Sequence, residues 1–216
     1  MPEAGRVIAG TAKGIRLIAP GEGTRPISDR VKQTLFAILE PTLRGARVLD
    51  LYAGSGAGGI EALSRGAAHA DFVEHDATAA RVIGQNLVRA RVDEHARIHR
   101  QDVAAFLRTA VADGPPPGWQ PYDVVIVDPP YADTAALAAT LEALASHADT
   151  LLTANCWVVA KHFWRTPPSQ AIGLLASTRG KRFGETALTF YRRSDRSPGT
   201  DREPGSDRDG EETERA

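Results

Sequence analysis

Apolar positions along the chain alternate between the spacing of strands and the spacing of helices. Continuous apolar runs typical of buried strands occupy residues 47–52, 71–76, 96–102, 122–131 and 156–163. Between them, apolar residues recur every three or four positions, which predicts helices over 79–90, 103–111 and 137–144. Two final strands are predicted over 171–178 and 186–192. This order predicts an α/β fold with a mostly parallel sheet of seven strands and helices on both faces.

The N-terminal segment has a different pattern. Residues 6–10 and 15–19 are short apolar runs separated by a glycine-containing turn, which predicts a small β-hairpin. Residues 28–39 show helical spacing, with Ser28 as the N-cap and Pro41 as the terminator. We therefore divide the chain into an extension over 1–42, a main domain over 43–193 and a tail over 194–216.

The tail changes how the net charge is interpreted. Residues 194–216 contain no large apolar side chain, and we predict that they are disordered. The whole chain has a net charge of −1, but the tail carries eight acids and four arginines. Residues 1–193 are therefore net positive, and the excess is concentrated in residues 5–36. A basic surface of this kind is either a solvated face or a contact for nucleic-acid phosphates.

Composition excludes several classes of protein. The chain has one cysteine, Cys156, which rules out a disulfide framework and a multi-cysteine metal site, and we expect that residue to be buried and structural. His95 and His99 lack the further ligands of a metal site, so no metal is predicted. No run of 18 apolar residues and no secretory signal occur, so we expect a cytoplasmic protein without a membrane segment, and a monomer.

Acidic residues follow four of the predicted strands. Asp50, Glu74, Asp102 and Asp128 lie 24, 28 and 26 residues apart, the length of one strand–helix–strand unit. The carboxyl ends of parallel strands form one edge of a sheet, where ligands of such folds bind. We therefore expect all four carboxylates at one site.

A glycine-rich loop follows the first of these strands. Gly54, Gly56 and Gly59 match a G-x-G-x-x-G pattern, and Glu74 lies twenty residues further on, where a carboxylate can accept hydrogen bonds from ribose hydroxyls. This pattern fits NAD and S-adenosylmethionine equally well. For Asp50 we expect an indirect role, either in holding loop amides or in binding the amino group of the cofactor. Asp102, with the Val103 amide, either binds adenine or caps the following helix.

The segment Asp128-Pro129-Pro130-Tyr131 carries the chemistry that separates these possibilities. Two prolines cannot continue a ladder of parallel strands, so the backbone stops and stiffens at the ligand edge. The Asp128 carboxylate and the Pro129 carbonyl are acceptors for an amine, and the Tyr131 ring is a surface on which a base can stack. This arrangement suits methylation of a planar substrate that carries an NH2 group.

Five separated segments together resemble one family. Residues 6–17, 24–39, 50–67, 128–131 and 181–191 are similar to the RsmD-type family, within the class I S-adenosylmethionine-dependent methyltransferases, which have a Rossmann-like fold. The resemblance covers roughly residues 6–192. It implies methylation of the exocyclic N2 of one guanine in 16S rRNA, within an assembling small ribosomal subunit.

The resemblance also implies roles for individual residues. The residues that it implies for binding the target base are Asp128, Pro129, Pro130 and Tyr131. The implied cofactor contacts are Asp50, Tyr52, Gly54, Ser55, Gly56, Glu74, His75, Asp102 and Val103. The implied RNA contacts are Arg6, Lys13, Arg16, Arg25 and Arg30. Two positions depart from the family pattern: Gly58 replaces an apolar residue, and Lys161 stands where relatives often have an acid.

Other functions share parts of this pattern. Methylation of adenine N6 in DNA or RNA, or of a protein glutamine amide, uses the same proline pair, although the basic N-terminal segment favours RNA. An NAD-dependent oxidoreductase would explain the glycine loop but not residues 128–131. An RNA-binding module without catalysis would leave the complete motif unexplained. Outside the motif, Trp119 and Trp164 are predicted to pack as lids, with Trp164 and Arg165 a possible RNA contact, and Lys181 and Arg182 receive no assigned role.

Overall fold

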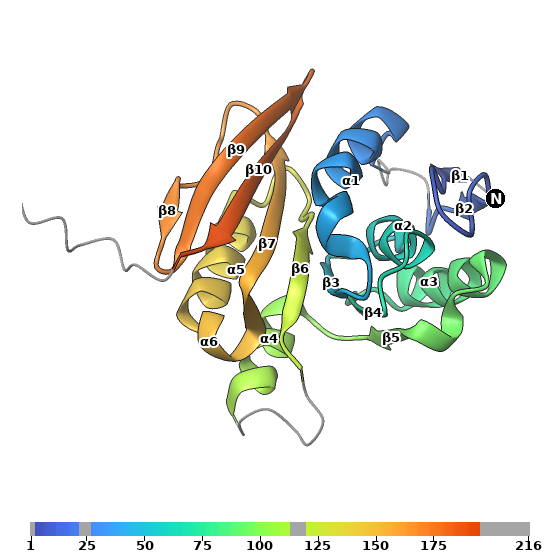
Figure 1. Cartoon of the computed structure of the whole chain (residues 1–216), viewed down its shortest axis with the longest axis horizontal. Coiled ribbons are helices and arrows are strands. Elements are labelled where there is room, and N and C mark those ends of the chain that lie inside the picture. Colours follow the sequence, from blue (N-terminus) through green and yellow to red (C-terminus); the bar gives the residue numbers. More distant parts are fainter. Residues whose placement is uncertain (1–2, 22–26, 113–119, 195–216) are drawn as a thin grey trace, which may run out of the picture.

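The computed structural model describes residues 3–21, 27–112 and 120–194, and its centre is a single large sheet (Figure 1). Within these residues the sheet has eight strands in the order β5-β4-β3-β6-β7-β10-β9-β8. The first five run parallel: β5 (Ala96–His99), β4 (His69–Val73), β3 (Arg47–Leu51), β6 (Tyr122–Val127) and β7 (Leu152–Phe163). The others are antiparallel: β10 (Thr186–Arg193), β9 (Leu175–Phe183) and β8 (Ala171–Ile172). The predicted mostly parallel sheet is confirmed, and the two-residue β8 extends it by one strand.

Helices cover both faces of the sheet. On one face lie α1 (Asp29–Leu43), α2 (Ala57–Ser64) and α3 (Ala77–Ala90), the last followed by the short 3-10 turn η1 (Asp93–His95); on the other lie α4 (Val103–Ala112), α5 (Thr134–Ser146) and α6 (Ala148–Leu151). Alternation along the strands supplies both cores: Val48 packs on the first face and Leu49 on the second. Cys156 is fully buried in the second core, as predicted. The parallel strands therefore read as continuous apolar runs.

The predicted N-terminal hairpin is present, but its first strand begins earlier than expected. β1 (Glu3–Arg6) pairs antiparallel with β2 (Arg16–Ile18), whereas the apolar pattern indicated a strand over 6–10. The ladder continues only to Val7, whose amide donates to the Ile15 carbonyl at 2.9 Å. The next residues leave the ladder because their backbone groups bind α2 instead.

Buried polar groups of α2 hold the hairpin against the domain. Glu61 is completely buried, and its carboxylate accepts the backbone N–H groups of Ile8 at 2.8 Å and Ala9 at 3.0 Å. The same carboxylate pairs with Arg65 Nε at 2.9 Å. The Ser64 hydroxyl donates to the Ala9 carbonyl at 2.6 Å. The hairpin turn is therefore fixed to the main domain, because its backbone groups form hydrogen bonds with buried side chains of α2.

Two further buried side chains fasten the hairpin. Lys32 on α1 is fully buried and donates to the Arg6 carbonyl, and burial lowers the pKa of its ammonium group. Asn86 on α3 accepts the Ile18 N–H at 2.8 Å and donates to the Ser55 carbonyl at 2.9 Å. Lys32 therefore does not contribute to an exposed basic surface, although its charge counted toward the N-terminal excess. Asn86 connects the hairpin directly to the glycine loop.

Other boundaries differ from the sequence pattern. Ser28 caps α1 as predicted, accepting the Val31 N–H at 3.4 Å, but the helix continues past Pro41 to Leu43. In the last turn a proline removes one backbone hydrogen bond, and the buried Leu43 side chain keeps the turn in the core. Apart from Ser194, the predicted tail lies outside the described residues. Within the described part of the chain, no helix is both long and apolar enough to cross a membrane.

Truncating Glu61 tests whether this docking is energetically important. Glu61→Ala leaves Arg65 and two backbone amides without their buried acceptor, so we expect a loss of about 3–5 kcal/mol in the free energy of unfolding. Glu40 also pairs with Arg65, at 2.7 Å, but its side chain is 56% exposed. Glu40→Ala should therefore cost less than about 1 kcal/mol. Urea denaturation of both variants measures the difference, and equal losses would contradict the proposed docking.

Candidate active site

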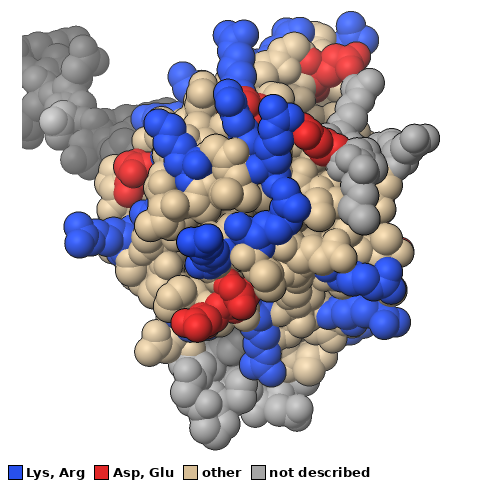
Figure 2. Space-filling view, turned by 90° about the vertical axis from the view of Figure 1, so that its right-hand side faces the viewer, with Lys and Arg blue, Asp and Glu red and all other residues tan. Residues whose placement is uncertain are grey.

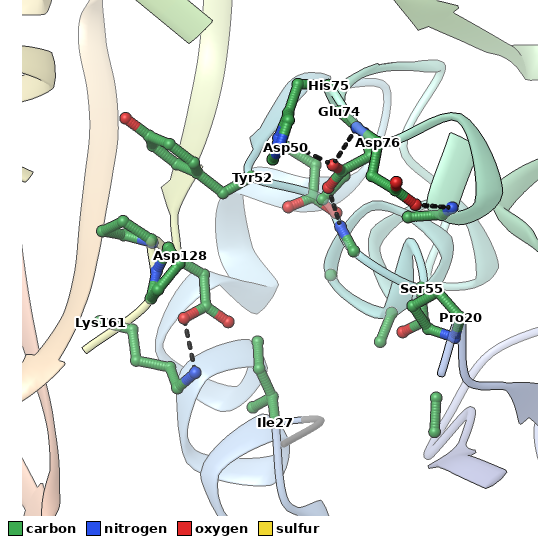
Figure 3. Close-up of a pocket in the computed structure, with 18 of the residues that line it drawn as sticks. Pro20, Ile27, Asp50, Tyr52, Ser55, Glu74, His75, Asp76, Asp128 and Lys161 are labelled. Atoms are coloured by element: carbon green, nitrogen blue, oxygen red, sulfur yellow. Dashed lines mark hydrogen bonds and ion pairs between the residues drawn. The ribbon is translucent and has the colours of Figure 1, made fainter. Parts of the chain in front are cut away.

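A cavity of about 530 Å³ opens at the carboxyl ends of β3, β4 and β6 (Figure 3). The glycine loop, the residues after β4, the residues after β6, and Pro20, Gly21 and Ile27 from between the hairpin and α1 surround it. Its lining comprises Ala4, Pro20, Gly21, Ile27, Asp50, Tyr52, Ala53, Gly54, Ser55, Ala57, Gly58, Glu74, His75, Asp76, Ala79, Asp128, Pro129, Pro130, Tyr131 and Lys161. Three of the four predicted strand-end acids therefore share one cavity.

The glycine loop between β3 and α2 adopts backbone conformations that favour glycine. Gly54 and Gly56 have φ values of +56° and +77°. Gly59 is required for packing rather than for a turn, because a Cβ there would lie 2.4 Å from the Phe72 ring. Tyr52 has the unusual φ of +59° and is held by a 2.8 Å hydrogen bond between its hydroxyl and that of Thr140.

Asp50 holds the start of α2, next to the glycine loop, by a buried hydrogen bond. Its carboxylate, only 3% exposed, accepts the Gly59 N–H at 2.8 Å. Burial raises the pKa of Asp50 to about 7; the bond from Gly59 opposes this, while the nearby Asp128 and Glu74 reinforce it. Asp50 therefore holds an amide of the first turn of α2, directly after the glycine loop, and its alternative predicted role of binding the amino group of a cofactor stays a prediction.

Glu74 bridges the loop to the segment after β4. One carboxylate oxygen accepts the Gly54 N–H at 2.9 Å, and the other accepts the Asp76 N–H at 2.9 Å. His75 lies beside it, with Nδ1 3.3 Å from the carboxylate, and Asp76 caps α3 by accepting the Ala79 N–H at 2.8 Å. Each carboxylate oxygen keeps a second lone pair, so Glu74 can still accept from a ligand hydroxyl.

Asp102 and Val103 are not among the residues that line this cavity. The Asp102 carboxylate accepts the Ala105 N–H at 3.1 Å and so caps α4, the alternative that the sequence left open. Val103 is buried in the core beneath α4. Their predicted contacts with an adenine ring stay a prediction.

The side of the cavity that residues 128–131 form contains a charge pair that the sequence did not predict. Lys161, near the end of β7, places Nζ 2.5 Å from Asp128 Oδ1 and 4.8 Å from the centre of the Tyr131 ring. Both partners of the ion pair are largely buried, with 11% and 18% of their side chains exposed. Burial raises the pKa of Asp128, and Lys161 opposes that rise. Figure 3 shows this pair across the cavity from Glu74 and His75.

Tyr131 is fixed at both ends of its side chain. Its hydroxyl bonds to that of Thr186 at 2.6 Å, and its ring lies beneath the Lys161 ammonium. Asp128, Pro129 and Pro130 continue from β6 into the cavity wall, as the stop at the two prolines predicts. The motif therefore forms a rigid, partly polar wall facing the glycine loop.

The predicted RNA-contacting residues belong to the hairpin, the segment that follows it and the start of α1. Arg6, Lys13, Arg16 and Arg30 are all exposed, and Arg25 lies outside the described residues. Arg6 pairs with Asp29 at 3.1 Å and Arg16 with Glu3 at 2.8 Å, so acids partly offset the charge of the hairpin. Figure 2, which views the side where the hairpin and α3 lie, shows far more basic than acidic side chains on this face.

Sequence reasoning did not anticipate the wall that the N-terminal segment contributes. Ala4, Pro20, Gly21 and Ile27 line the cavity, and Figure 3 shows Ile27 near Lys161 and Pro20 near Ser55 of the glycine loop. Apolar residues flanking a hairpin carry no signal for a ligand site. Only the docking of the hairpin on α2 and α3 brings them there.

Comparison with known proteins is consistent with this site. A family model described as "Conserved hypothetical protein 95" matches residues 5–192. The chain is 38% identical over 156 residues, 71% of this chain and 72% of the relative, to "Ribosomal RNA small subunit methyltransferase D" of Haemophilus influenzae. It is also 35% identical over 191 residues, 87% of this chain and 98% of the relative, to YlbH of Bacillus subtilis. The chain belongs to the RsmD-type family.

The RsmD-type fold is shared by solved structures. The structure of the Escherichia coli protein yhhF has a TM-score of 0.74 and 28% identity, and covers 88% of this chain and 98% of that one. Of the two departures from the RsmD-type pattern, Gly58 lies against the buried carboxylate, since a Cβ there would be 3.0 Å from Asp50 Oδ2. The other departure, Lys161, forms the charge pair with Asp128.

The raised pKa of Asp50 predicts a pH-dependent cost to stability. Between about pH 4 and 7 the folded protein retains a proton on Asp50 that the unfolded chain has lost, so stability falls as pH rises through this range. Asp50→Asn keeps an acceptor for Gly59 and removes the titration. Relative to this variant, wild type should lose on the order of 4 kcal/mol from pH 4 to pH 8. Urea denaturation across this range should show no such divergence for the exposed Asp133→Asn; parallel curves for wild type and Asp50→Asn would contradict the assignment.

Proposed function

We propose that this protein transfers a methyl group from S-adenosylmethionine to the exocyclic N2 of a guanine in 16S rRNA. The observation that carries the proposal is the shared cavity: the glycine loop and Glu74 line one side, and residues 128–131 line the other. A cofactor loop alone fits many reactions, and an amine-binding motif alone fits several folds. Their placement on one cavity fits transfer between a nucleoside-containing donor and a planar amine.

The residues present fit the methyl donor. Glu74 offers carboxylate lone pairs for ribose hydroxyls, and Gly54 has no side chain to obstruct close approach of the loop. Asp50, Glu74 and Asp128 give the cavity an acidic lining that suits a ligand with a sulfonium and an ammonium group. S-adenosylmethionine supplies a methyl group on a positively charged sulfur, which makes the methyl carbon electrophilic.

The motif residues align the acceptor amine. Asp128 and the Pro129 carbonyl accept hydrogen bonds from the two N–H groups of the amine, and the Tyr131 ring stacks on the base. These contacts would aim the nitrogen lone pair at the methyl carbon that bound S-adenosylmethionine would supply. The proton released from nitrogen passes to the Asp128 carboxylate and then to water.

RNA is the proposed acceptor for two reasons. The hairpin, whose Ala4 lines the cavity, carries the exposed Arg6 and Arg16, and the start of α1 carries the exposed Arg30. Family relatives are named as methyltransferases of small-subunit ribosomal RNA. We infer that the substrate is 16S rRNA in an assembling small subunit, where the target base is still accessible. Adenine N6 and a glutamine amide are the alternative acceptors, and mass-spectrometric identification of the methylated group distinguishes them from guanine N2.

Asp128 provides the first test of this mechanism. Asp128→Asn keeps the shape of the side chain but has no negative charge and only one acceptor oxygen. Methyl transfer to 16S rRNA should therefore fall at least about 100-fold. The affinity for S-adenosylhomocysteine, measured by calorimetry, should change by less than about threefold, because the variant leaves Glu74 and the glycine loop unchanged. Asp133→Ala, which removes an exposed helix cap five residues away, is the matched control and should retain activity. Loss of cofactor affinity with unchanged turnover would refute the assigned role.

Lys161 provides the second test. Its ammonium lowers the pKa of Asp128, so Lys161→Met should raise that pKa further and move the acidic limb of the rate profile to higher pH. Lys161→Arg keeps the charge and should restore the limb toward its original position. Measuring methyl transfer from pH 5 to 9 distinguishes this role from simple destabilisation, which would lower the rate without shifting the limb.

A further inference from the structure

A second group of basic and aromatic side chains lies at the carboxyl end of β7. The Trp164 cluster consists of Trp164 and Arg165, which follow β7, and Lys181 and Arg182, near the end of β9. The Arg182 guanidinium carbon lies 3.5 Å from the centre of the Trp164 ring, and that of Arg165 lies 4.9 Å from it. Two arginines therefore stack on one indole.

The cluster is organised by the backbone as well as by stacking. Arg182 Nε donates to the Gly184 carbonyl at 3.0 Å, which fixes the plane of the guanidinium group. The backbone N–H of Trp164 donates to the Glu185 carbonyl at 3.1 Å, which joins the end of β7 to the β9–β10 turn. Trp164 is half-buried, whereas Arg165, Lys181 and Arg182 are exposed. A flat, charged surface is thus held ready without the conformational entropy cost of ordering free side chains.

This surface adjoins the acceptor side of the cavity. Thr186, which pairs with Phe163 in the ladder of β10 and β7, bonds to the Tyr131 hydroxyl at 2.6 Å. Lys161, three residues before Trp164, lines the cavity itself. Figure 1 shows the tip of the β9–β10 hairpin and the first turn of α1 at the same end of the molecule. Exposed basic residues therefore stand at this end both near the β9–β10 turn and at the start of α1.

We propose that the Trp164 cluster binds the RNA segment next to the target nucleotide. This inference rests on the proposed function, because an exocyclic amine reaches the cavity only if its base is unpaired and removed from the stack. The neighbouring nucleotides are then single-stranded, with bases and phosphates both exposed. Arg182, held flat, offers a stacking surface to a base, and Arg165 and Lys181 offer charge to phosphates. The N-terminal hairpin holds the RNA on the other flank.

The test uses the full chain and 16S rRNA prepared from a strain that lacks the gene. In the Arg165→Gln/Arg182→Gln double variant we expect the KM for RNA to rise about tenfold with kcat unchanged. The slope of log affinity against log salt, measured by filter binding, should decrease in magnitude by about 0.7, because Arg165 is the one phosphate contact that this variant loses. Arg182→Lys keeps the charge but not the stacking plane, and should keep the salt slope while losing part of the affinity.

Arg108→Gln, at an exposed position of α4, is the matched control and should change neither quantity. A KM and a salt slope equal to those of wild type in the double variant, with unchanged melting temperature, would overturn the proposal. If wild type transfers no methyl group to rRNA, the proposed function fails, while the filter-binding comparison still decides whether the cluster binds RNA. The two failures are therefore distinguishable.

Discussion

Buried carboxylates that accept backbone amides hold the working parts of this molecule together. Glu61 takes two amides of the hairpin turn, Asp50 takes the Gly59 amide in the first turn of α2, and Glu74 takes the Gly54 amide of the loop. Three of these four bonds involve α2, a helix of eight residues. Its first turn supports the glycine loop and its last turn anchors the N-terminal hairpin. The donor side of the cavity and the proposed RNA-contacting hairpin are consequently parts of one rigid unit.

This shared support explains how two substrates of very different size can meet at one place. An in-line displacement requires the amine and the methyl carbon to be aligned closely, and rigid walls supply that alignment before the substrates bind. The wall opposite the loop is equally constrained, because Lys161 pairs with Asp128 and Thr186 bonds to Tyr131. The proposed Trp164 cluster extends the same wall outward, so orientation of the RNA and of the base would depend on the same strands.

Periodicity predicted the sheet, its helices and the edge at which the site lies, since Asp50, Glu74 and Asp128 all meet there. It could not show that Glu61 and Lys32 are buried, because their partners lie in the hairpin, 53 and 26 residues away. The pairing of Lys161 with Asp128 depends on two strands lying side by side, which local pattern does not encode. Asp102 satisfied the strand-end pattern equally well, yet its carboxylate caps a helix.

We propose that one guanine of 16S rRNA receives a methyl group on its exocyclic nitrogen. Mass-spectrometric mapping of methylated nucleotides in rRNA from a strain that lacks the gene identifies that guanine. We expect a single guanosine of 16S rRNA to lose its N2 methyl group and to regain it when the wild-type gene is restored. An unchanged methylation pattern in 16S rRNA, or the loss of a methyl group from an adenine instead, would contradict it.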